Sequence, residues 1–180
     1  MPNFFPTLLA CLATAISAHA WATEPSSAAI KDPGFEALGI PGANAAWRFV
    51  QHAGVRAYDF SADSDIRYSG KQSLRIRRLH PQVYGAALQV LTGAPAGKYR
   101  LQAQMRSRAV DGRGWGLHVR VVHADGTSNS YYALAVTGDR DWSLSYVDFD
   151  FGPGDRAIEV GVSLNGAGTG WVDDVAIVSR

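Results

Sequence analysis

The chain has 180 residues, of which 17 are lysine or arginine and 16 are aspartate or glutamate, giving a formal net charge of +1. Acidic and basic residues are interspersed, so the chain lacks the positive field that holds nucleic acid or anionic lipid, and neither is an expected partner. Once a targeting segment is set aside, the remaining length suits one domain with a sizeable core.

The first 22 residues have the composition of a secretory signal peptide. The stretch from Leu8 to Ala18 is apolar and small, and small-x-small cleavage motifs end at Ala20 and Ala22. The apolar run is well short of the ~20 residues that a membrane helix needs, so we expect no membrane insertion. The alternative is a lipoprotein box at residues 8–11. We predict a signal peptide at 1–22 and a secreted or periplasmic protein.

The single cysteine, Cys11, lies inside this apolar segment. Cleavage removes it, so the mature chain is expected to have neither a disulfide nor a thiolate metal site. Residues 23–29 are small and polar, which is typical of a linker. The folded domain is predicted to span residues 30–180.

From residue 30 onward, alternating apolar and polar runs are separated by turn residues at short intervals, a pattern typical of a sandwich or barrel. The turns at 93–97, 111–112 and 152–154 contain glycine or proline. No stretch sustains helical periodicity, so we predict an all-β antiparallel β-sandwich of about ten strands. The clearest strands are expected at 73–79, 86–91, 98–108, 115–123, 131–136, 143–151, 157–164 and 171–178.

Alternation also assigns side chains to faces, because neighbouring residues on a strand point to opposite sides. The apolar members of 98–108, 115–123 and 157–164 are expected in the core. If these strands pair side by side, their polar members form one face suited to hydroxyl-rich ligands. The alternative is an ordinary solvated sheet face. The polar members include Gln102, Gln104, Arg106, His118 and Arg120.

Three segments occur in a distinctive order: DPGFE at 32–36, YSGKQSLRI at 68–76 and GTGWVDDV at 168–175. Over essentially all of 30–180 the chain resembles the galactose-binding-like jelly-roll carbohydrate-binding modules that accompany xylanases and cellulases. The resemblance implies an exported, non-catalytic jelly roll that engages a polysaccharide or glycan. The alternative is a structural or protein-interaction β-sandwich with a protein partner and no sugar ligand, because a fold does not fix a function.

The resemblance further implies a structural calcium that joins the two ends of the sandwich. Its ligands would be the Glu36 carboxylate, the Lys71 backbone carbonyl and the Asp173 carboxylate. This donor set suits calcium, a hard cation that binds carboxylate and carbonyl oxygens. The alternative is that Glu36 and Asp173 only cap loops or pair with nearby bases.

In the family that the chain resembles, sugars stack on aromatic rings and bond to planar polar side chains. The tryptophans at 115, 142 and 171 are expected to be structural, because they alternate with apolar neighbours or sit at scaffold positions. Arginines in the set would equally suit an anionic ligand such as a uronic acid. The candidate ligand-binding residues are Trp47, Tyr84, Gln89, Gln102, Gln104, Arg106, His118, Arg120 and Tyr131.

The sequence contains no recognised catalytic motif, such as a nucleophile elbow, a His-Glu-x-x-His zinc motif or a phosphate loop. Glycoside hydrolysis needs a pair of carboxylates, and Asp148 and Asp150 share a strand face. Their alternation with Val147 and Phe149 is typical of a solvated strand side, however. We therefore expect no enzymatic activity.

Overall fold

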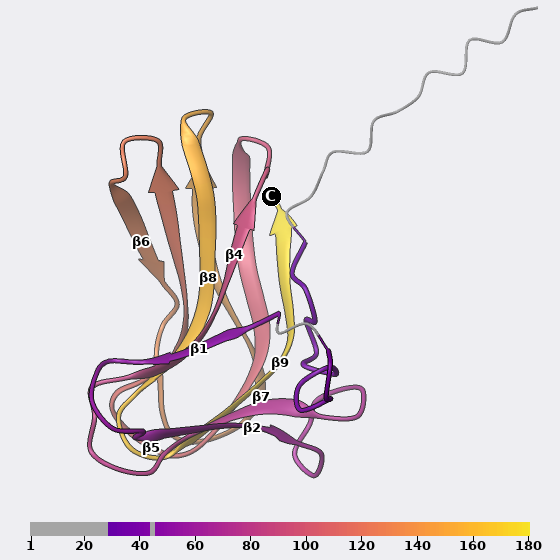
Figure 1. Ribbon diagram of the computed structural model, residues 1–180, viewed down its shortest axis with the longest axis vertical. Coiled ribbons are helices and arrows are strands. Elements are labelled where there is room, and N and C mark those ends of the chain that lie inside the picture. The colour runs from indigo at the N-terminus through magenta and orange to yellow at the C-terminus, as the bar shows by residue number, and fades with distance from the viewer. Residues whose placement is uncertain (1–28, 44–45) are drawn as a thin grey trace, which may run out of the picture.

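The computed structural model describes residues 29–43 and 46–180, and every regular element in this part of the chain is a β-strand (Figure 1). The predicted signal peptide and residues 23–28 of the predicted linker lie outside the described residues and stay predictions. Within the described part, no helix is long and apolar enough to cross a membrane. The strands are β1 (Arg48–Gln51), β2 (Tyr58–Asp63), β3 (Ser73–Arg78), β4 (Gly85–Thr92), β5 (Gly97–His123), β6 (Ser128–Tyr132), β7 (Val136–Phe151), β8 (Asp155–Asn165) and β9 (Thr169–Ser179).

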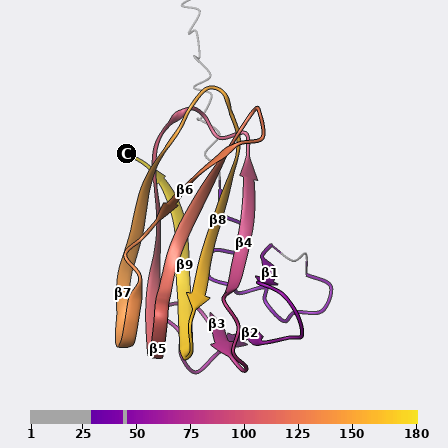
Figure 2. The same ribbon diagram turned by 90° about the vertical axis from the view of Figure 1, so that its left-hand side faces the viewer.

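These nine described strands form two layers that share the long strand β5. Residues 97–108 of β5 pair with β7 and β9, whereas residues 114–123 pair with β8 and β6. The first sheet has the order β1-β4-β8-β5-β6, and the second has the order β2-β3-β9-β5-β7. In Figure 2, β7 of the second sheet and β4 of the first lie towards opposite sides of the molecule. The predicted antiparallel β-sandwich is confirmed.

The chain passes from one sheet to the other within β5, where the sequence predicts a turn at 111–112. The pairing of β5 with β7 shifts register repeatedly between Met105 and Trp115. Gly112 and Gly114 have φ angles of 66° and 89°, and a Cβ on either would lie 2.8 Å from a backbone oxygen of a neighbouring strand. Only glycine fits such positions without strain. The two glycines therefore allow a bend inside the single strand β5, and they do not form a hairpin between two strands.

The predicted strand at 131–136 is wrong in its bounds, because β6 ends at Tyr132 and β7 begins at Val136. The apolar residues that follow Tyr132 extend the alternating pattern although they belong to the connection. In β6, Tyr131 pairs with Val119, whose side chain is fully buried. Tyr131 therefore faces the core, and Tyr132 faces the outside of the first sheet.

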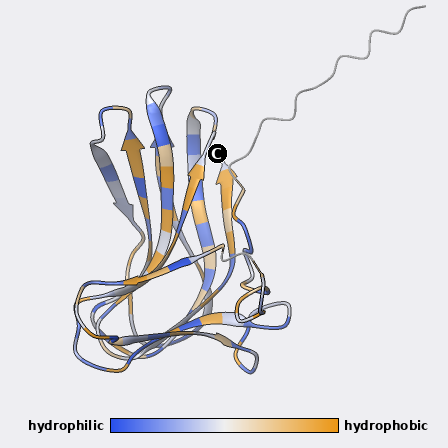
Figure 3. Ribbon diagram, viewed as in Figure 1, coloured by the Kyte–Doolittle hydropathy of each residue, from blue (hydrophilic) through white to orange (hydrophobic). Residues whose placement is uncertain are grey.

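The core that alternation predicts is confirmed, and hydrophobic and hydrophilic residues alternate along the strands in Figure 3. The two sheets meet closely at Gly170 of β9, where a Cβ would lie 2.4 Å from the fully buried ring of Trp115. The predicted inward residues, all buried, are Tyr99, Leu101, Ala103, Met105, Trp115, Leu117, Val119, Val121, Ile158, Val160, Val162 and Leu164.

The outward polar side chains of β5 do not all lie on one face of the sandwich. Both halves of β5 turn their apolar side chains towards the same core, so their outward side chains lie on opposite sides of the sandwich. Gln104 lies on the outer face of the second sheet, and His118 lies on the outer face of the first. The prediction that these polar side chains form a single face is wrong.

Candidate functional site

A groove of about 240 Å³ lies on the outer face of the first sheet, and we call it the His118 groove. Its floor follows one row of paired residues across the sheet. Leu88 of β4 pairs with Gly161 of β8, Gly161 pairs with His118 of β5, and His118 pairs with Tyr132 of β6. The lining residues are Val50, Tyr84, Ala86, Leu88, His118, Tyr132, Glu159, Ser163 and Asn165.

His118 lies low in this groove because its neighbour on β8 has no side chain. A Cβ on Gly161 would lie 2.4 to 2.6 Å from Cε1 and Nε2 of His118 and Cδ2 of Leu88. Burial lowers the pKa of His118, and the nearby Glu159 carboxylate only partly opposes this effect. The imidazole is therefore neutral at neutral pH, with one ring nitrogen as donor and the other as acceptor.

Glu159 supplies the carboxylate of the groove and is held by two arginines. Its Oε1 lies 3.3 Å from Nε of Arg120, and its Oε2 lies 3.3 Å from a terminal nitrogen of Arg48. The Glu159 side chain is 13% exposed, whereas the two arginines lie further out. The carboxylate is thus fixed in position and its charge is compensated before any ligand binds.

Two tyrosines border the groove, one just before β4 and one at the end of the edge strand β6. Tyr84 comes just before β4 and makes an edge contact with His52, with ring centroids 5.8 Å apart. Tyr132 ends β6, is 73% exposed, and its ring centroid lies 6.3 Å from that of His118. At one end of the groove, Asn165 donates a hydrogen bond to the Ser163 hydroxyl. The groove thus combines flat rings with oriented hydrogen-bonding groups.

No family model and no curated protein matches this chain. Solved structures do resemble it. Family 16 carbohydrate-binding module-2 is 17% identical, with 83% of this chain and 99% of that chain covered and a TM-score of 0.62. TmCBM61 in complex with β-1,4-galactotriose is 20% identical, with 83% and 97% covered and a TM-score of 0.55. The chain has the jelly-roll fold of carbohydrate-binding modules.

The jelly roll also resembles parts of larger proteins. The CBM22-1–GH10 modules of Clostridium thermocellum xylanase 10B, complexed with xylohexaose, are 13% identical, with 86% of this chain and 29% of that chain covered and a TM-score of 0.62. The enzymatically active domain of bacteriophage CBA120 tailspike protein 4 is 13% identical, with 74% and 19% covered and a TM-score of 0.58. A cyclase from Fischerella sp. TAU is 14% identical, with 84% and 96% covered and a TM-score of 0.54. At these identities the likeness shows the fold alone, so function has to be argued from the groove.

Three of the predicted ligand-binding residues meet at the His118 groove of the jelly roll. Tyr84 and His118 line the groove itself. Arg120 lies beside it and positions the Glu159 carboxylate. The structure thus brings together residues from β5 and from the segment before β4 that are far apart in the sequence.

Four other predicted residues lie away from the groove. Gln102 and Gln104 are half-buried on the outer face of the second sheet, paired with residues of β7. Arg106, on the same face, forms an ion pair of 3.3 Å with Asp141. Tyr131 packs inward, with its ring centroid 6.1 Å from that of Phe149. None of the four borders the groove.

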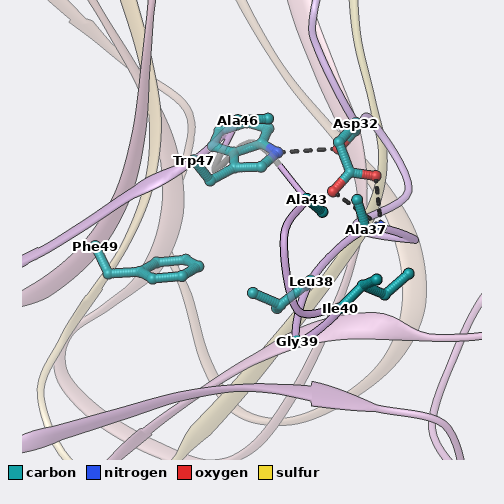
Figure 4. Close-up of a pocket in the computed structure, with 9 residues that line it drawn as sticks. All are labelled: Asp32, Ala37, Leu38, Gly39, Ile40, Ala43, Ala46, Trp47 and Phe49. Atoms are coloured by element: carbon teal, nitrogen blue, oxygen red, sulfur yellow. Dashed lines mark hydrogen bonds between the residues drawn. The ribbon is translucent and has the colours of Figure 1, made fainter.

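Trp47 and Gln89 are both 6% exposed and have structural roles in the jelly roll. The Trp47 ring packs 4.9 Å from Phe35, and its indole N–H donates to the Asp32 carbonyl at 2.9 Å (Figure 4). The Gln89 side chain bonds to the backbone N–H and carbonyl of Lys31, at 2.7 and 3.0 Å. Trp47 also lines a small pocket of about 110 Å³ (Figure 4), and neither Trp47 nor Gln89 lines the His118 groove.

The sequence predictions did not include Tyr132, Glu159, Ser163 or Asn165 among the ligand-binding residues. Alternation places Glu159 and Ser163 on the outward side of their strand, so the sequence indicates that their side chains reach the surface but not that they join a site. Nothing in the sequence shows that β8 pairs with the second half of β5, which is what puts Glu159 beside His118 and Arg120. Tyr132 was missed because the prediction chose its neighbour Tyr131, whose side chain packs inward.

The predicted calcium ligands lie at the end of the sandwich where the segment 32–36 meets β9. Asp173 is fully buried, and its carboxylate accepts backbone N–H bonds from Tyr68, Ser69 and Asp174 at 2.9, 3.1 and 2.8 Å. Desolvation raises the pKa of Asp173 despite these bonds. Among the described ion pairs, none involves Asp173. A buried carboxylate without a cationic partner is costly when ionised.

Glu36 lies next to this buried acid. A Cβ on Gly34 would lie 3.5 Å from Oδ1 of Asp173 and 3.8 Å from Oε1 of Glu36, so both carboxylates flank Gly34. Glu36 also accepts the N–H of Lys71 at 2.9 Å. Among the described residues, no three His, Cys, Asp or Glu side chains cluster as metal ligands, so backbone carbonyls would have to complete the set. A metal held by these two carboxylates would be a cation that prefers oxygen, such as calcium, and not one that prefers nitrogen or sulfur.

Proposed function

We propose that this jelly roll binds a polysaccharide or glycan in the His118 groove and does not transform it. The observation that carries the proposal is the neutral His118 imidazole, set between the rings of Tyr84 and Tyr132 beside the fixed Glu159 carboxylate. Rings offer flat apolar surfaces to the C–H faces of a sugar, and the imidazole and carboxylate match adjacent hydroxyls. The solved modules bound to β-1,4-galactotriose and xylohexaose support this reading.

The charges of the groove accommodate a neutral sugar or a uronic acid. Glu159 pairs with both Arg48 and Arg120, and one carboxylate offsets only one of their two positive charges. The lining of the groove argues against hydrolysis. Glycosidases use a pair of carboxyl groups, whereas Glu159 is the single carboxylate among the described residues that line the groove. A binding function is therefore better supported than a catalytic one.

Replacing His118 or Tyr84 by alanine is expected to weaken retention on the polysaccharide that binds wild-type protein. Each net hydrogen bond or ring contact contributes roughly 0.5–1.5 kcal/mol, which corresponds to about a twofold to tenfold loss of affinity. The measurement is pull-down on insoluble xylan, β-1,4-galactan and cellulose, followed by affinity electrophoresis.

Gln104→Ala is the matched control, because it removes a half-buried polar side chain from the outer face of the second sheet. It should bind like the wild type. Folded wild-type protein that no polysaccharide retains would contradict the proposal and favour the protein-interaction alternative. Loss of binding in Gln104→Ala with retention in His118→Ala would place the site on the other sheet.

We also propose that the protein is exported, because residues 1–22 have the pattern of a signal peptide and polysaccharides of this kind lie outside the cytoplasm. The expected mature chain begins after Ala20 or Ala22. Mass spectrometry of the protein recovered from periplasm and medium measures this end. An intact N-terminus on protein found in the cytoplasm would contradict export.

A further inference from the structure

A second hollow, of about 570 Å³, runs along the edge of the sandwich between β6 and β7, and we call it the edge hollow. Both strands pair with β5 alone among the described strands, so each is the last strand of its sheet. Figure 2 looks onto this edge of the molecule. Four large side chains that line the hollow are exposed: Tyr132 by 73%, Leu134 by 92%, Leu144 by 54% and Tyr146 by 50%.

Tyr132 connects the two hollows, because its side chain lines both the His118 groove and the edge hollow. Alone, the His118 groove is smaller than the ~300–1,000 Å³ usual for ligand sites. With the edge hollow added, the combined volume lies well within that range. A ligand longer than the His118 groove would therefore continue past Tyr132 into the edge hollow.

The side chain of Tyr146 is ordered by a cation–π contact with Arg100. The Arg100 guanidinium lies 4.0 Å from the centroid of the Tyr146 ring. Asp148 fixes that guanidinium through two hydrogen bonds, of 2.7 and 3.0 Å, and also accepts a bond of 2.6 Å from Arg180. Tyr146 pairs with Gln102 and so lies on the outer face of the second sheet, where the strand borders the edge hollow. A ring that is already ordered and exposed loses little entropy when a flat ligand stacks on it.

The lining of the edge hollow favours a hydroxyl-rich occupant. Ser143 and Ser145 contribute hydroxyl groups beside the two tyrosines. The acid in the lining, Asp148, pairs with both Arg100 and Arg180, so it is not free to repel a ligand. A wholly apolar partner would leave the serine hydroxyls unpaired. The His118 groove likewise combines tyrosine rings with hydroxyl groups and a carboxylate that is paired with two arginines.

We propose that a single oligosaccharide chain occupies both hollows, passing from Tyr84 over Tyr132 and around the edge of the sandwich to Tyr146. This inference rests on the proposed glycan-binding function and adds to it the length and path of the ligand. The His118 groove holds a short segment, and the edge hollow holds the units that follow. Affinity therefore depends on chain length, and Tyr146 contributes only to long chains.

The test compares disaccharides with hexasaccharides of β-1,4-xylose, β-1,4-galactose and β-1,4-glucose by isothermal titration calorimetry. Wild-type protein is expected to bind one hexasaccharide at least fivefold more tightly than its disaccharide. Tyr146→Ala should lower hexasaccharide affinity about fivefold and leave disaccharide affinity unchanged. Tyr84→Ala should lower both.

Two further variants keep the outcome clear. Tyr68→Ala removes a tyrosine that is also 50% exposed but packs against Trp142, outside both hollows, and should bind like the wild type. Leu134→Ser changes a side chain that is 92% exposed, so it should weaken only the hexasaccharide without affecting folding. Equal affinity for short and long chains, or equal losses in Tyr146→Ala, would overturn the inference and leave the proposed function standing. If no sugar binds folded wild-type protein, both fail together.

Discussion

Gly161→Ala is expected to remove most glycan binding while the protein stays folded. The added methyl group would lie 2.4 to 2.6 Å from His118 and Leu88, so both side chains must move out of their positions in the groove. His118 then no longer lies between Tyr84 and Tyr132. We expect a loss of roughly tenfold or more, about 1.4 kcal/mol, on the polysaccharide that retains wild-type protein. Affinity electrophoresis measures the loss.

The matched control is Gly154→Ala, in the turn before β8, where a Cβ would meet nothing within 4 Å. It should change neither binding nor stability. Overpacking in Gly161→Ala costs about 1–3 kcal/mol of stability, so thermal unfolding is recorded to show that the variant is folded. Unchanged binding in folded Gly161→Ala would show that the ligand does not depend on the position of His118.

The second large effect concerns the calcium that we propose at Glu36 and Asp173. A chelator is expected to lower the melting temperature of the wild-type protein. A ligand present at one hundred times its dissociation constant stabilises by about 2.7 kcal/mol, which corresponds to roughly 5–10 °C for a chain of this size. Differential scanning calorimetry with calcium and with chelator measures the difference. Equal melting temperatures would contradict the site.

Two substitutions distinguish the effect of bound calcium on stability from the effect of the hydrogen bonds at the same place. Glu36→Gln removes the charge but keeps an acceptor for the N–H of Lys71, so it should lose the response to chelator and keep the fold. Asp174→Asn is the control. Asp174 has a φ of 50°, which asparagine also tolerates, and we expect the calcium response to persist.

The calcium effect should also depend on pH. Burial raises the pKa of Asp173, so without metal the folded chain holds this proton more tightly than the unfolded chain. The stability that Asp173 contributes is then present below its unfolded pKa and is lost as the pH rises through the raised value. Calcium takes the place of the proton, so the difference between calcium and chelator should grow from acid to neutral pH.

The fold class was largely predictable. Period-two alternation located the core residues of β5 and β8, and the three ordered motifs indicated the jelly roll that the solved structures confirm. The site was only partly predictable. His118 was predicted because alternation places it on the outward face of its strand, and Tyr84 because an aromatic residue beside a turn stands out from alternation. Trp47 had the same appearance, yet its ring packs on Phe35 in the interior.

The sequence by itself determined which side of each strand faces the core, because alternation follows from the local geometry of an extended backbone. Only the tertiary structure decided which strands are neighbours, because pairing depends on contacts between residues far apart in the chain. The bend at Gly112 and Gly114 separates Gln104 from His118 on opposite sides of the sandwich. The pairing of β5 with β8 and β6 brings Glu159 and Tyr132 to His118, and with them the groove in which we propose that a sugar binds.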